Sequence, residues 1–225
     1  MDESTVAATF SATLVDEFVR AGVTDAVVAP GSRSTPITVA LARHEGIRVH
    51  VHVDERSAGF VALGLGRATG RPAVVVTTSG TAAVELHPAV VEADLAGVPL
   101  LVCTTDRPPE LHGVGAPQTV DQSGLYGRSV RAFVEPGVPR EGTAWSWRSL
   151  AARAGLNATG KRPGPVHLNL AFNEPLLAVP GALPEGRVDG APWHAGSLGK
   201  AGYTAVPALE GRRGVLVAGR GGDPA

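Results

Sequence analysis

The sequence predicts an α/β fold in which a parallel sheet is covered by helices on both faces. Short apolar runs typical of strands alternate with longer amphipathic stretches typical of helices, at intervals of about 25 residues. The runs VVVTT and LLVCTT are almost wholly apolar, as parallel strands buried on both sides are. Polar loops follow these strands, so we expect the loops to gather at one edge of the sheet.

The N-terminal part of the chain reads as helix, strand and helix. Phe10, Leu14 and Phe18 recur at helical spacing, and Gly22 follows as a stop signal. A short apolar run then leads into the polar loop PGSRS. The expected elements are a helix over 5–21, a strand over 25–29, a loop over 30–34, and a helix over 35–44 with Thr35 as N-cap and Pro36 as first helical residue.

The stretch Ile47–Gly70 changes its period at one acidic residue, Glu55. Valines alternate with polar residues before it, and small and apolar residues recur at helical spacing after it. Glu55 therefore belongs at the carboxyl end of a parallel strand, where ligands of open α/β sheets bind. The remaining expected elements are strands over 47–53, 73–78, 100–104, 129–134 and 165–170, helices over 56–69, 82–96 and 140–156, and a long loop after Thr105.

The domain organisation follows from composition. The elements above make one domain over residues 1–180. Residues 181–212 hold many Pro and Gly without clear periodicity and are expected to be a linker. Residues 213–225 contain GVLVAGRGG at 214–222, which predicts a strand and glycine turn that start a further domain cut short at Ala225.

Charge and composition exclude several classes of function. Lys and Arg total 20 against 21 Asp and Glu, which offers no electrostatic argument for binding nucleic acid or a membrane surface. No apolar run reaches the about 18 residues of a membrane span, and the N-terminus lacks the pattern of a signal peptide. The single Cys103 lies in an apolar run and predicts a buried core residue. We expect a soluble cytoplasmic protein.

Two arginines follow predicted strands. Ser32 and Arg33 stand before a helix N-terminus, where a carboxylate or phosphate can bind, although a capped turn with a solvated arginine explains the pattern equally well. Arg107 occupies the same position after the strand over 100–104. Two cations at one edge of the sheet suggest an acidic substrate.

Other patterns have simpler readings. Glu55 is either a surface acid at a helix start or a buried acid that shares a proton with a ligand nitrogen. His50 and His52 share a strand face, yet only Asp54 offers a further metal ligand, so structural histidines are favoured over a metal hydrolase site. The glycines 64, 66 and 70 lie inside a helix, which argues against a dinucleotide fingerprint.

Six strings resemble a known family. They are VVAPGSRSTPITVAL, HVDERSAGFVALGLGRATGRP, VVTTSGTAAVELHPAVVEA, LLVCTTDRPPEL, GAPQTVDQSGLYG and GPVHLNLAFNEPL, and the resemblance covers roughly residues 23–177. They are similar to 2-succinyl-5-enolpyruvyl-6-hydroxy-3-cyclohexene-1-carboxylate synthases, the thiamine-diphosphate transferases of menaquinone biosynthesis. The resemblance implies that residues 1–180 are the pyrimidine-binding domain of a carboligase, active at the interface of a homodimer or homotetramer.

The resemblance also implies roles for individual residues. Glu55 matches the glutamate that activates the cofactor through N1′ of its aminopyrimidine. The enzyme decarboxylates 2-oxoglutarate and adds the succinic semialdehyde carbanion to isochorismate, both dicarboxylates. The implied cofactor-binding residues are Glu55, Pro30, Thr78 and Ser79, and the implied substrate-binding residues are Ser32, Arg33, Arg107 and Gln118.

One departure from the family pattern limits these expectations. The Gly-Asp-Gly segment and later Asn that hold Mg²⁺ and the diphosphate are missing, so we expect that site outside this segment and no metal ligand within it. The chain alone is then expected to fold but not to catalyse. The alternatives are a thiamine-dependent decarboxylase or acetolactate-type synthase with other substrates, and a non-catalytic fragment or pairing module.

Overall fold

A computed structural model describes residues 1–196 of the chain, so the expected domain start at 213–225 lies outside the described residues. The described part contains a six-stranded sheet in the order β2-β1-β3-β4-β6-β5, and every neighbouring pair of strands is parallel. This confirms the predicted fold class. The strands are β1 (Asp25–Val28), β2 (Arg48–Val51), β3 (Ala73–Thr77), β4 (Leu100–Asp106), β5 (Ala132–Val134) and β6 (Pro165–Ala171).

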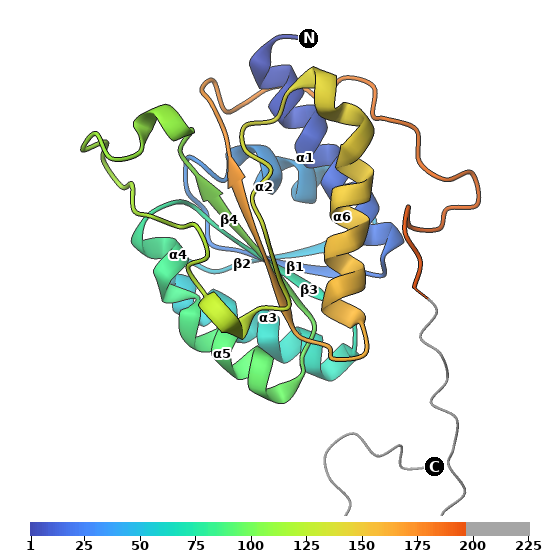
Figure 1. Ribbon diagram of the computed structural model, residues 1–225. Coiled ribbons are helices and arrows are strands. Elements are labelled where there is room, and N and C mark those ends of the chain that lie inside the picture. The colour runs from blue at the N-terminus through green and yellow to red at the C-terminus, as the bar shows by residue number, and fades with distance from the viewer. Residues whose placement is uncertain (197–225) are drawn as a thin grey trace, which may run out of the picture.

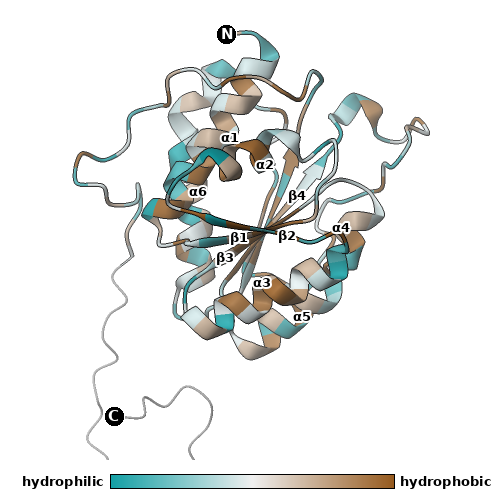
Figure 2. Ribbon diagram, turned by 180° about the vertical axis from the view of Figure 1, so that it is seen from behind, coloured by the Kyte–Doolittle hydropathy of each residue, from teal (hydrophilic) through white to brown (hydrophobic). Residues whose placement is uncertain are grey.

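Helices cover both faces of the sheet (Figure 1). Helices α1 (Glu3–Arg20), α2 (Thr35–Arg43) and α6 (Ala144–Thr159) form one layer, and α3 (Glu55–Thr69), α4 (Thr81–Glu85) and α5 (His87–Ala96) form the other. Each layer shares a separate hydrophobic core with the sheet. Both α3 and α5 contain hydrophobic segments, drawn brown in Figure 2, and residues of both helices belong to the second core.

The sequence signals for helix starts explain where Glu55 lies. The Asp54 side chain accepts a hydrogen bond from the Ser57 backbone N–H at 2.7 Å and caps α3. Gly70 ends the helix in the left-handed conformation, with φ of 65°. Glu55 is thereby the first residue of α3, directly after the turn that leaves β2.

Three predicted helices differ in detail from the structure. The helix expected over 82–96 is broken into α4 and α5, because Pro88 has no N–H to donate back to the preceding turn. Ser34, not Thr35, is the residue before α2. The helix expected from residue 140 begins at Ala144, after a short 3-10 helix, Glu141–Thr143.

The runs VVVTT and LLVCTT are buried as predicted, whereas the edge strand β2 is partly exposed. Every residue of β3, β4 and β6 is buried, including Cys103, whose burial raises the pKa of its thiol to about 12. Strand β2 lies at one edge of the sheet. Its last residue, Val51, is 65% exposed, and Val53 just after it is 90% exposed. Their alternation predicted a strand, but no described element covers them.

After β6 the chain continues without helix or strand along the layer of α1 and α6 (orange in Figure 1). The Gly181 N–H donates to Thr9 Oγ1 at 2.9 Å, and Arg148 Nε donates to the Pro184 carbonyl at 2.8 Å. The described part of the predicted linker is therefore docked on the domain.

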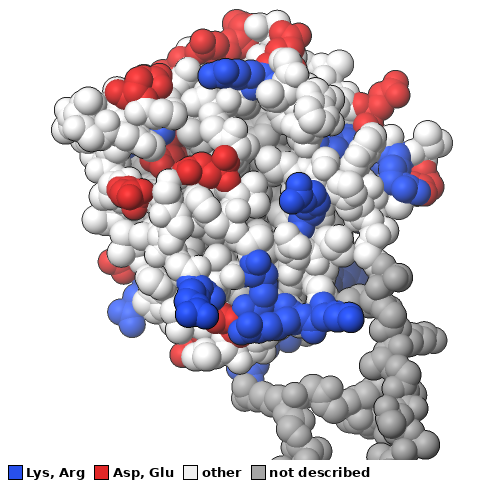
Figure 3. Space-filling view, in the orientation of Figure 1, with Lys and Arg blue, Asp and Glu red and all other residues white. Residues whose placement is uncertain are grey.

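Charged side chains are unevenly distributed. On the face seen in Figure 3, basic side chains gather toward the lower end and acidic ones are more frequent toward the upper end. The net charge of −1 conceals this separation. Among the described helices, none has the length and apolar character needed to cross a bilayer.

Candidate active site

The strand order creates a natural ligand-binding position between β1 and β3. From β1 the chain moves outward to β2 on one side, and from β3 it moves outward to β4 on the other. The loops that leave β1 and β3 therefore separate at this point, which is where open α/β sheets bind ligands. These loops contain Pro30, Ser32 and Arg33 on one side and Thr78 and Ser79 on the other.

The two loops are in close contact through Gly31. A Cβ atom at this position would lie 2.4 Å from Thr78 Cβ, so only glycine allows the approach. The Gly31 carbonyl also accepts a hydrogen bond from Ser34 Oγ at 2.9 Å. The resemblance did not single out Gly31. Its position between the end of a predicted strand and the polar residues of the loop is the sequence signal that could have identified it.

Arg33 is buried, not solvated, which rules out one reading of its loop. Its side chain donates to the Phe172 carbonyl at 2.8 Å and to Glu174 Oε1 at 3.2 Å, and its Nε has no partner among the described residues. Burial lowers the pKa of its guanidinium, and the positive charge of Arg107 lowers it further. The two arginines expected at the sheet edge are thus electrostatic neighbours.

Two backbone N–H groups at the start of α2 are paired within this loop. Ser34 N donates to the Gly31 carbonyl at 3.2 Å and Thr35 N donates to the Ser32 carbonyl at 3.1 Å. Ser32 itself is exposed. These two N–H groups are therefore not available to an anion.

Arg107, Ser79 and Gln118 form one hydrogen-bonded group. Arg107 Nη1 donates to Ser79 Oγ and, at 2.9 Å, to the Gln118 carbonyl. Gln118 Nε2 donates to the Ser79 carbonyl at 3.0 Å. Gln118 has a φ of 56°, which is uncommon for a residue with a side chain. The structure therefore brings together residues that lie far apart in the sequence.

Glu55 lies at the carboxyl end of β2, beside the loop that leaves β1. Its side chain is half-buried and has no hydrogen-bond partner among the described residues. The hypothesis of a buried acid is therefore not fulfilled by this chain alone. A second surface laid against β2 and α3 would be needed to complete the burial.

His50 has a structural partner. Its Nε2 lies 2.9 Å from Asp25 Oδ1, and Arg48 Nη2 donates to Asp25 Oδ2 at 3.0 Å. Burial alone would raise the pKa of Asp25, but hydrogen bonds from Arg48, His50 and Thr24 lower it to about 2. This favours the structural reading of His50. Within residues 1–196, no group of three or more His, Cys, Asp or Glu side chains is placed to hold a metal ion.

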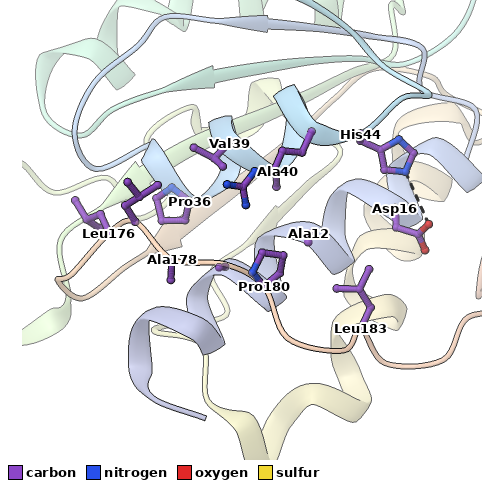
Figure 4. Close-up of a pocket in the computed structure, with 13 residues that line it drawn as sticks. Ala12, Asp16, Pro36, Val39, Ala40, His44, Leu176, Ala178, Pro180 and Leu183 are labelled. Carbon is purple, nitrogen blue, oxygen red and sulfur yellow. Dashed lines mark ion pairs between the residues drawn. The ribbon is translucent and has the colours of Figure 1, made fainter.

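A separate cavity of about 250 Å³ lies between α1, α2 and the segment after β6 (Figure 4). Ala12, Val39 and Leu183 contribute to its largely apolar wall, and His44 and Asp16, 3.9 Å apart, lie at one end. None of the predicted site residues lines it. The predicted site is instead the group of loops at the carboxyl ends of β1 to β4.

Comparisons with known proteins identify the family of this chain. Residues 8–125 match the family model for the thiamine pyrophosphate enzyme N-terminal TPP binding domain. A relative from Thermobifida fusca named 2-succinyl-5-enolpyruvyl-6-hydroxy-3-cyclohexene-1-carboxylate synthase is 60% identical over 173 residues, which cover 76% of this chain and 31% of the relative.

Relatives with the same name occur in other organisms. The protein of Saccharopolyspora erythraea is 50% identical over 94% of this chain and 40% of its own length. That of Halobacterium salinarum is 52% identical over 83% of this chain and 32% of its own length. The chain thus spans about a third of the length of the curated relatives it matches.

Proposed function

Because the chain belongs to the family of thiamine pyrophosphate enzyme N-terminal TPP binding domains, we propose that residues 1–180 are the pyrimidine-binding domain of a 2-succinyl-5-enolpyruvyl-6-hydroxy-3-cyclohexene-1-carboxylate synthase. The identity of 50–60% to proteins of that name supports the proposal. The observation that carries it is the free Glu55 carboxyl group at the end of β2, beside the β1 and β3 loops.

The described residues fit the pyrimidine end of thiamine diphosphate. The half-buried Glu55 carboxyl group has no partner among residues 1–196, so it is available to a ring nitrogen. Pro30 is exposed on the β1 loop, while Thr78 and Ser79 begin the β3 loop, and Gly31 holds the two loops together. When bound, thiamine diphosphate supplies a carbon nucleophile for a 2-oxo acid. The Glu55 carboxyl group would hold the proton that N1′ of the pyrimidine exchanges.

The Mg²⁺ and diphosphate site belongs, in this proposal, to a part of the protein outside this segment. Residues 181–212 then act as the linker to the next domain. The enzyme is a cytoplasmic homodimer or homotetramer whose active site lies at the subunit interface. The exposed Val51 and Val53 beside Glu55 support an interface here, since a partner would bury them together with the acid.

The substrates proposed are the dicarboxylates 2-oxoglutarate and isochorismate. Arg107 uses Nη1 for Ser79 and Gln118, while its Nη2 and Nε have no partner among the described residues. That edge of the guanidinium group is suited to a carboxylate. Arg33 adds a second positive charge to the loop beside it, and Ser32 and Gln118 add polar side chains at the same edge.

Substitution Glu55→Gln tests the proposal in the complete enzyme with thiamine diphosphate and Mg²⁺. Turnover of 2-oxoglutarate with isochorismate should fall at least about 100-fold, because the amide cannot exchange the proton. Cofactor affinity, measured by calorimetric titration, should change far less. Asp54→Asn is the matched control, since asparagine also caps a helix and should leave turnover intact.

Unchanged turnover in Glu55→Gln would contradict the proposal. Activity of the wild-type enzyme on pyruvate alone would favour a decarboxylase or acetolactate-type synthase. Turnover by the 225-residue chain alone would overturn the expected division of the site between domains. A complete protein that binds no cofactor would favour the non-catalytic pairing module.

A further inference from the structure

Gln122 is fully buried and makes hydrogen bonds with both ends of its amide. Its Oε1 accepts from the Gly80 N–H at 2.8 Å, directly after Ser79. Its Nε2 donates to Asn169 Oδ1 at 2.8 Å and to the Thr105 carbonyl at 3.2 Å. Only one orientation of the amide satisfies one donor and two acceptors at once.

Asn169, which accepts a hydrogen bond from Gln122, is itself held by hydrogen bonds to neighbouring side chains. Thr104 and Asn169 are cross-strand partners on β4 and β6, and Thr104 Oγ1 donates to Asn169 Oδ1 at 2.9 Å. Asn169 Nδ2 donates to Asp106 Oδ2 at 2.9 Å and to Glu135 Oε1 at 2.7 Å. The amide of Asn169 cannot turn over without breaking these bonds, so it keeps Gln122 in place.

Gln122 contacts the Ser79–Gly80 loop from the protein interior, and Arg107 and Gln118 contact the same loop from its more exposed side. Gly80 has a φ of 83°, and a Cβ atom there would lie 2.9 Å from Gln118 Cγ. A shift of Ser79–Gly80 would therefore move Gln118 and remove a hydroxyl partner from Arg107. Gln122 is the buried contact that ties the loop to the sheet.

We propose that Gln122, supported by Asn169, is a positioning residue that holds Ser79–Gly80 and thereby aims Arg107 and Gln118 at the substrate carboxylate. It touches no substrate itself. This inference rests on the proposed function for the identity of the substrate, whereas the holding of the loop can be measured without it.

Two substitutions separate positioning from simple destabilisation. Gln122→Met removes all polar contacts at similar length. Gln122→Glu keeps the acceptor for Gly80 but turns an oxygen toward two acceptors, unless the acid is protonated. Thr13→Val is the matched control, because it removes a buried hydrogen bond of 2.7 Å within α1, away from these loops.

Hydrogen exchange of the Gly80 amide in the 225-residue chain is the first measurement. Gln122→Met should speed exchange at least about tenfold, as expected when a buried amide loses its acceptor. Thr13→Val should leave the exchange rate of the Gly80 amide unchanged, when each protein is measured the same number of degrees below its own melting temperature. Unchanged exchange in Gln122→Met would overturn the inference, whatever the enzyme acts on.

Kinetics of the complete enzyme are the second measurement. Gln122→Met should raise the KM for a dicarboxylate substrate about tenfold with a smaller change in kcat, because binding and not proton exchange is disturbed. The defect of Gln122→Glu should shrink from pH 8 to pH 6, since burial raises the pKa of the new acid and its protonated form donates again.

A role confined to stability would lower the melting temperature in all three variants and leave KM and its pH dependence as in the wild type; that result overturns the inference. If the wild-type enzyme does not use 2-oxoglutarate and isochorismate, the proposed function fails instead. The exchange rate of the Gly80 amide then tests by itself whether Gln122 holds the loop.

Discussion

His167 shows how one buried residue depends on its neighbours. Thr104 donates its hydroxyl hydrogen to Asn169, so His167 Nε2, 2.7 Å from Thr104 Oγ1, must be the donor in that pair. His167 Nδ1 has no partner among the described residues, and the ring packs on Tyr126 with centroids 4.6 Å apart. Burial lowers the pKa of His167 to about 3. The histidine is therefore neutral in the folded protein.

This burial predicts a pH dependence of stability. The unfolded chain binds the proton near pH 6.5 while the folded chain does not, so the contribution of His167 is complete above pH 6.5 and is lost as the pH falls toward 3. We expect this effect to lower the free energy of unfolding by about 1.5 kcal/mol between pH 6.5 and pH 5. Urea unfolding of wild type and His167→Gln at both pH values measures it. Identical pH slopes in the two proteins would refute the prediction.

The positions of single site residues at strand ends could be predicted from the sequence, but their contacts and burial could not. Glu55, Arg33 and Arg107 could be placed at strand ends because each follows an apolar run. That Arg33 turns inward to the Phe172 carbonyl could not be seen, since this contact joins residues 139 positions apart. Gln122 carried no local signal, because its importance comes from a loop 42 residues away.

At the scale of elements, a buried ion pair joins α1, α6 and the segment after β6. Arg148 Nη1 lies 2.8 Å from Glu17 Oε2 and 2.5 Å from Asp16 Oδ2, and Glu17 Oε1 accepts from the Trp193 N–H. Burial alone would lower the pKa of Arg148, but its hydrogen bonds to the two acids raise it. The same side chains thus hold two helices and direct the chain that leaves the domain.

Removal of Arg148 should therefore loosen a specific segment. Arg148→Met leaves Glu17 buried without its partner, which should lower the free energy of unfolding by about 3 to 5 kcal/mol. Limited proteolysis should cut within 181–194 first, because the segment also loses the bond to the Pro184 carbonyl. Arg187→Met is the control: it removes an exposed pair with Asp189, which water screens, and should leave the free energy of unfolding nearly unchanged. Equal protease sensitivity of both variants would disprove the role.

Helix boundaries show where local patterns succeed and fail. Asp54 and Gly70 delimit α3 through caps that belong to the local sequence, so this helix was predicted within one residue. The break between α4 and α5 was missed, although Pro88 was visible, because the apolar pattern continues across it. The exposure of Val51 depends on β2 being an edge strand, which its own residues do not reveal.

At the scale of the whole molecule, Cys103 reports on global opening. It is the single cysteine, it is fully buried in the middle of β4, and burial raises the pKa of its thiol to about 12. A thiol reagent can reach it only when the sheet opens. The rate of labelling should therefore follow the equilibrium population of the unfolded chain.

Phe10→Ala tests this expectation. Phe10 packs edge-on against Trp147 and Phe172, with ring centroids 5.3 and 6.4 Å away, so its loss should cost about 3 to 5 kcal/mol. Labelling of Cys103 should become more than about 100-fold faster, since 1.4 kcal/mol corresponds to a factor of ten. Leu95→Ala, at a side chain 77% exposed, should leave the rate unchanged. Equal labelling rates in the two variants would show that Cys103 opens locally.

The sequence alone determined the alternation of strands and helices, the parallel sheet covered on both faces, and the candidate residues at strand ends. These are properties of periodicity and of turn residues, which act over a few neighbouring positions. Only the tertiary structure decided the strand order, the contact of Gly31 with Thr78, the inward turn of Arg33 and the hold of Gln122 on Gly80. These depend on packing and hydrogen bonds between residues distant in the chain, which no local pattern encodes.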